Sequence, residues 1–222
     1  MKTNSTVNTK TIVTVAMLCA IAFVAKLISN VFPVVSGFLS FDLKDVVIVI
    51  GGFIMGPMGA ALISFIVSFI EMVTISSTGP IGLIMNVLAS CSFACVAAAF
   101  YHRNRTMKNA IAGLIAGVLC MTVIMLLWNY LITPLYMKVP REVVVGMLLP
   151  VFLPFNLVKG GINATLALLL YKPVVTALRK ANLVEARPSS SGGKSTKWGV
   201  VIVSAVLLIS FILLALVLAG VL

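Results

Sequence analysis

Residues 199–222 read GVVIVSAVLLISFILLALVLAGVL, a run of 24 residues without a charged side chain. About 20 such residues suffice for a helix to cross the hydrocarbon core of a bilayer. The whole chain has the same character, because 61% of its 222 residues are apolar and only 9% are charged. Soluble domains carry about 25% charged residues. The composition therefore excludes a soluble enzyme, a disordered tail and a disulfide-stapled secreted module, and it indicates an integral membrane protein.

Six further apolar segments precede this run, and we expect each to form a helix in the membrane. They cover residues 11–32, 46–55, 58–75, 81–101, 110–136 and 143–171. The sequence thus predicts an all-α, polytopic helix bundle with a body of six helices and a seventh, C-terminal transmembrane helix. We expect a membrane domain over 1–180, a basic Ser/Gly-rich linker over 181–198, and the added helix over 199–222.

The net charge of +11 sets the expected orientation rather than indicating nucleic-acid binding, because the basic residues lie between apolar runs. With a cytoplasmic N-terminus, the inner segments of the six-helix body and its linker hold Lys2, Lys10, Arg103, Arg105, Lys108, Lys172, Arg179, Lys180, Arg187, Lys194 and Lys197. The outer segments hold Lys44, Lys138 and Arg141. The positive-inside rule therefore predicts a multi-pass protein of the cell membrane with a cytoplasmic linker and an extracellular C-terminus.

Three polar side chains within the apolar segments are candidate ligand-binding groups. With the orientation above, Asn129, Asn156 and Lys159 all fall in the outer half of the protein. Asn156 and Lys159 share a helix face, and Pro150 and Pro154 loosen the backbone before them. This pattern favours an outward-facing pocket for a polar, aromatic-sized solute. The alternative is that the amides bond neighbouring helices while Lys159 extends to the membrane surface.

Two further motifs have a functional and a purely structural interpretation. The hydroxyl-rich loop before Pro80 contains Thr78 and Gly79, where a ligand could approach the backbone, although any helix hairpin favours such residues. Ala16 and Ala20 lie one turn apart in the first apolar segment, which permits close approach of another helix. Alanine is common in membrane helices, so this spacing alone is weak evidence of a partner.

Catalytic and metal-binding patterns are missing from the sequence. His102 is the single histidine, so no Ser/His/Asp set is available, and we find no phosphate-binding glycine loop and no H-E-x-x-H motif. The four cysteines lie within apolar segments, where we expect them to pack as small hydrophobic groups. We predict no metal, no resident cofactor and no enzymatic activity.

Several motifs, in their order along residues 10–180, resemble one family. These are Ala16-x-x-x-Ala20, the run FLSFDLKD over 38–45, Gly56-Pro57, Thr78-Gly79-Pro80, Asn129-Tyr130 before Pro134, and the stretch 153–160. The chain resembles the substrate-binding (S) components of energy-coupling factor (ECF) vitamin transporters, and among them the riboflavin-specific S component. The seventh helix departs from this resemblance, since the family body has six.

The resemblance implies a function, partners and site residues. It implies high-affinity capture of riboflavin at the outer face, and release inward with a transmembrane coupling subunit and two cytoplasmic ATPases. Ala16 and Ala20 would form the docking surface for the coupling subunit. The implied ligand-binding residues are Ser40, Asp45, Thr78, Gly79, Asn129, Asn156 and Lys159.

Three alternatives remain open. The chain could be an S component for another solute such as thiamine, folate or a queuosine precursor. It could be an intramembrane enzyme, which would need acids facing one another, or a helical scaffold without a ligand. The identity of the bound ligand separates an S component for another solute from a riboflavin-specific one. The surroundings of Asp42, Asp45 and Glu71 test whether the chain is an intramembrane enzyme.

Overall fold

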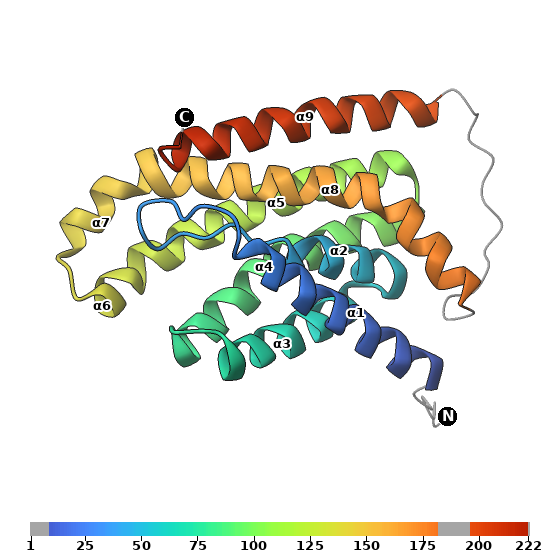
Figure 1. Cartoon of the computed structure of the whole chain (residues 1–222), viewed down its shortest axis with the longest axis horizontal. Coiled ribbons are helices and arrows are strands. Elements are labelled where there is room, and N and C mark those ends of the chain that lie inside the picture. The colour runs from blue at the N-terminus through green and yellow to red at the C-terminus, as the bar shows by residue number, and fades with distance from the viewer. Residues whose placement is uncertain (1–8, 182–195, 222) are drawn as a thin grey trace.

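A computed structural model describes residues 9–181 and 196–221, and its regular elements there are all helices (Figure 1). They are α1 (Thr9–Ser29), α2 (Lys44–Met55), α3 (Pro57–Thr74), α4 (Gly79–Asn104), α5 (Met107–Leu131), α6 (Thr133–Met137), α7 (Arg141–Met147), the π-helical η1 (Leu148–Phe152), α8 (Leu153–Lys180) and α9 (Thr196–Leu218). The expected all-α membrane bundle is confirmed. Most of the linker, residues 182–195, lies outside the described residues, so the predicted domain boundaries stay predictions.

Within the described part of the chain, six helical stretches are long and apolar enough to cross a membrane. They are α1, α3, α4, α5, the run from α7 through α8, and α9. The expected second span forms α2, but its 12 residues extend only about 18 Å. Nine of these residues are buried, so α2 is a core helix surrounded by the others rather than a span of its own.

The sequence chemistry explains where the helices end. Gly56 ends α2 at φ +95°, which a residue with a side chain rarely adopts, and Pro57 begins α3 at the position where its missing N–H costs nothing. Thr106 caps α5 by accepting a hydrogen bond from the Asn109 N–H at 3.2 Å. The fifth apolar segment does not continue to residue 136 as expected, because α5 ends at Leu131 and α6 follows.

The helices pack in a spatial order that leaves α9 at one edge of the bundle. Contacts link α3 to α4, α4 to α5, α5 to α8, and α8 to α9, and Figure 1 shows α9 lying along α8. Gly117 lets α5 approach α4 closely, since a Cβ there would lie 2.5 Å from the Phe93 carbonyl oxygen. The start of α1, the α4–α5 connection and the end of α8 gather at one end of the molecule, opposite α6, α7 and the α3–α4 connection.

Candidate functional site

A cavity of about 290 Å³, here called the polar cavity, lies beside the α3–α4 connection. Its walls come from α1, the segment between α1 and α2, α3, the α3–α4 connection, α4, α5 and α8. The lining residues are Lys26, Asn30, Phe38, Leu39, Ser40, Asp42, Glu71, Ile75, Ser76, Ser77, Thr78, Met85, Asn86, Ala89, Met121, Met125, Asn129, Phe155, Asn156 and Lys159. Twelve of these 20 residues are polar and eight are apolar, so the cavity offers a small molecule both hydrogen-bonding groups and apolar surface.

The residues implied by the resemblance fall into two groups in the structure. Ser40, Thr78, Asn129, Asn156 and Lys159 line the polar cavity. Asp45 lies behind its wall in α2, 1% exposed, where the Ser90 hydroxyl donates to its Oδ1 at 2.5 Å. Gly79 does not line the cavity but begins α4 at φ +56°. Five of the seven residues thus surround one space. The other two do not line it: Asp45 is bonded to Ser90, and Gly79 begins α4.

The end of α5 holds the Asn129 amide in a fixed orientation. Its Nδ2 donates to the Met125 carbonyl at 2.7 Å, and its Oδ1 accepts from the Thr133 hydroxyl at 2.8 Å. Thr133 opens α6, so the break after Leu131 brings its hydroxyl within reach of the amide. Asn129 is 8% exposed, and its remaining hydrogen-bonding capacity faces the polar cavity.

The start of α8 positions Asn156 and Lys159 through an irregular helix. The backbone is π-helical over Leu148–Phe152, next to Pro154, whose nitrogen cannot donate a hydrogen bond. The Asn156 Nδ2 donates to the Phe152 carbonyl at 2.8 Å. Among the described residues no carboxylate lies within 4 Å of the Lys159 ammonium, which therefore keeps its donors for other groups in the cavity. The loosened backbone expected from the prolines is confirmed.

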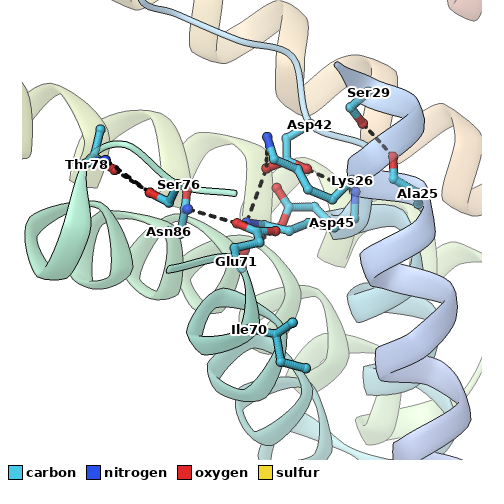
Figure 2. Close-up of polar contacts among 12 residues, drawn as sticks. Ala25, Lys26, Ser29, Asp42, Asp45, Ile70, Glu71, Ser76, Thr78 and Asn86 are labelled. Carbon is cyan, nitrogen blue, oxygen red and sulfur yellow. Dashed lines mark hydrogen bonds and ion pairs between the residues drawn. The ribbon is translucent and has the colours of Figure 1, made fainter. Parts of the chain in front are cut away.

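A buried ion network forms one side of the cavity (Figure 2). The Lys44 ammonium lies 2.6 Å from Glu71 Oε2 and 3.2 Å from Asp42 Oδ2, and Lys26 lies 3.7 Å from the same Asp42 oxygen. The Asn86 amide donates to Glu71 Oε2 at 3.1 Å. We expected Lys44 among the charges of the outer segments. Its side chain is only 1% exposed, so that expectation is wrong.

The network anchors the segment between α1 and α2. Burial disfavours the charged form of Asp42, but the nearby lysine ammonium groups, Lys44 above all, outweigh burial and hold the pKa of Asp42 below its ordinary value. The Ser29 hydroxyl donates to the Ala25 carbonyl and accepts from the Leu43 N–H at 2.8 Å. These bonds join the end of α1 to the start of α2, so the segment that lines the cavity is fixed at both ends.

Apolar groups complete the walls. Phe38, Leu39 and Phe155 come from the α1–α2 segment and α8, and Met85, Met121 and Met125 come from α4 and α5. The polarizable methionine sulfurs and flanking aromatic rings suit a flat, conjugated solute.

Neutralising Glu71 tests the contribution of the ion network to stability. We expect Glu71→Gln to keep the side-chain volume while replacing a charge-assisted bond from Lys44 by a neutral one, at a cost of about 1–2 kcal/mol. The measurement is the thermal unfolding midpoint of the purified protein without ligand. Glu142→Gln is the matched control, because Glu142 is exposed at the start of α7. Equal midpoints for the two variants would contradict a stabilising network.

The two alanines of α1 lie away from the cavity. Ala16 and Ala20 are both exposed on α1, whereas Leu18, Cys19 and Ala22 of the same helix face the core. α9 packs on α8, and Figure 1 shows it at the edge of the bundle away from α1. The small-residue face of α1 is therefore uncovered in this structure.

The chain is similar to known transporter subunits. The sequence pattern that defines the family described as "ECF transporter, substrate-specific component" matches residues 10–171. "Riboflavin transporter RibU" of Staphylococcus aureus (strain TCH60) is 30% identical over 177 residues, covering 77% of this chain and 93% of the relative. "Riboflavin transporter FmnP" of Bacillus subtilis (strain 168) is 28% identical and covers 78% of this chain and 98% of the relative.

A solved structure agrees with the fold. It is described as the S component of a bacterial ECF transporter, and it superposes with a TM-score of 0.64 at 31% sequence identity. The match covers 77% of this chain and 98% of that structure. α9 begins at Thr196, beyond the family match that ends at residue 171. The six-helix body therefore has a solved counterpart of nearly its full length.

Proposed function

The chain belongs to the substrate-specific (S) components of ECF transporters, and on this premise we propose that it is the riboflavin-binding subunit of such a transporter. The observation that carries the proposal is the polar cavity itself. The amides of Asn129 and Asn156 and the ammonium of Lys159 reach one space from two different helices. Riboflavin has a flat ring with donors and acceptors along one edge and a hydroxylated chain at the other end. The amides suit the ring edge, and hydroxyls such as those of Ser40 and Thr78 suit the hydroxylated chain.

The proposed orientation puts the cavity at the outer face. The basic residues Arg103, Arg105 and Lys108 lie around the α4–α5 connection, at the end of the bundle opposite the α3–α4 connection (Figure 1). By the positive-inside rule that end is cytoplasmic. The vitamin would then enter from outside, and a coupling subunit with two cytoplasmic ATPases would drive its release inward. Riboflavin is the cargo here, not a resident cofactor.

The charged groups favour transport over intramembrane catalysis. An enzyme of this kind would need free acids that face one another, but Asp42 and Glu71 both pair with Lys44. Within the described residues no group of three or more His, Cys, Asp or Glu side chains could hold a metal ion. The relatives are named as transporters, which agrees with a binding subunit.

The ligand that stays bound through purification tests the proposal. We expect the full-length protein, purified in detergent from riboflavin-containing medium, to be yellow with a flavin absorption spectrum. Stripped protein should bind added riboflavin and ignore thiamine and folate. Glu142→Gln protein should behave in the same way. A colourless preparation that does not bind riboflavin but retains another vitamin would contradict the proposal and show that the chain binds that vitamin instead.

A further inference from the structure

α9 docks on α8 through a matched pair of residues. Phe211 of α9 lies over Gly161 of α8, and a Cβ on Gly161 would come within 2.5 Å of the Phe211 ring. A glycine that leaves room for one aromatic ring fixes the position of α9 along α8. α9 is thus a packed part of the fold, although it lies beyond the residues that the family match covers.

The same face of α9 contacts the segment between α1 and α2. Phe41 of this segment, Phe155 of α8 and Ala215 of α9 belong to one buried apolar cluster, with Leu208 and Phe211 packed against it. Phe41 is only 4% exposed, with its ring 5.1 Å from that of Phe155. The lipid side of this segment is therefore partly covered by α9.

Residues 40–43, here called the partition segment, separate α9 from the polar cavity. Ser40 and Asp42 line the cavity, whereas Phe41 and Leu43 line a second space beside α9. Along the partition segment the lining residues thus alternate between the two spaces. One face of the partition segment therefore meets the ligand site, and the other meets α9.

That second space, here called the apolar hollow, has a volume of about 250 Å³ and only apolar lining residues. They are Phe32, Pro33, Phe41, Leu43, Ile162, Leu166, Leu208, Ile212, Ala215 and Leu216. The hollow lies between the partition segment and α9, and its lining includes the exposed Phe32 and Ile212, so it is a groove at the surface of the bundle. α9 forms one wall of this groove and limits how far the partition segment can move away from the polar cavity.

We propose that α9 positions the partition segment, and so controls how fast a bound ligand escapes from the polar cavity. The proposal rests on the riboflavin-binding function above. Phe211 acts as a positioning residue: it does not itself line the polar cavity, but it holds α9 on α8. If α9 shifts, Phe41 and Leu43 lose packing contacts with it. Ser40 and Asp42, which line the polar cavity, then move with them.

Ligand release from full-length variants tests this role. We expect Phe211→Ala to speed riboflavin dissociation about tenfold while the association rate changes much less. Phe211→Leu should restore most of the slow release, because leucine still fills the space over Gly161. Ile209→Ala is the matched control, since Ile209 is a 60% exposed residue of α9. Release is followed by the loss of protein-bound radiolabelled riboflavin after mixing with a large excess of unlabelled riboflavin.

A second variant keeps the test decisive if Phe211→Ala does not fold. Leu216→Ala enlarges the apolar hollow directly behind Phe41 and Leu43, and we expect faster release of the same kind. Wild-type release rates in both variants, or equally fast release in Ile209→Ala, would overturn the positioning role. If the wild-type protein binds no riboflavin, the proposed function fails instead, so the two failures are distinguishable.

Discussion

Replacing Asn156 by leucine lowers riboflavin affinity by about a hundredfold. Leucine keeps the branched shape of the side chain, although it is larger, and the ring edge of the ligand loses an amide partner. A buried polar group left without its hydrogen bond costs about 1–3 kcal/mol, which corresponds to roughly 5- to 150-fold in affinity. Equilibrium titration of stripped protein with riboflavin measures the effect.

Asn163 supplies the matched control for this variant. It is an asparagine of the same helix, 1% exposed, and it does not line the polar cavity. Its Oδ1 has no hydrogen-bond partner within the described structure, so Asn163→Leu removes an amide without removing a ligand contact. We expect Asn163→Leu to bind riboflavin with wild-type affinity. Unchanged affinity in Asn156→Leu as well would favour a scaffold without this ligand site.

The sequence predicted the helices because apolar length is a local property. Each expected segment forms a helix, and the strongest deviation, α2, follows from its length of 12 residues. The end of α5 at Leu131 was missed, although Pro134 lies in the first turn of α6, where proline commonly begins a helix. Hydropathy alone does not show a change of chain direction between apolar residues.

The polar cavity was predictable only in part, because some of its residues interact across a short separation in sequence and others across a long one. Asn156 and Lys159 share a helix face, so their sequence spacing indicates a common direction. Lys44 pairs with Glu71, 27 residues away in sequence. Between Asp42 and Asp45 this lysine looks like part of a hydrated loop. Nothing local to Lys44 indicates that Glu71 would neutralise it inside the bundle.

The exposed alanines of α1 lead to the second large prediction, which concerns coupling rather than binding. Ala16→Leu should reduce ATP-driven riboflavin uptake about a hundredfold in cells or vesicles that contain the complete transporter. Small side chains let helices approach closely in a bilayer, where lipid provides no hydrophobic drive for association. A larger residue at such a contact costs up to about 3 kcal/mol through overpacking. Riboflavin binding by the isolated subunit should stay unchanged, because Ala16 lies outside the cavity.

Ala112→Leu is the control that separates docking from a general effect of added bulk. Ala112 is an exposed alanine of α5, and we expect its leucine variant to bind and transport as the wild type does. Ala20→Leu, one turn along the same face as Ala16, should share the uptake defect. The role of α9 predicts a different pattern, since Phe211→Ala changes ligand release in the isolated subunit. Loss of riboflavin binding in purified Ala16→Leu protein would show that this face supports the cavity and is not a docking surface.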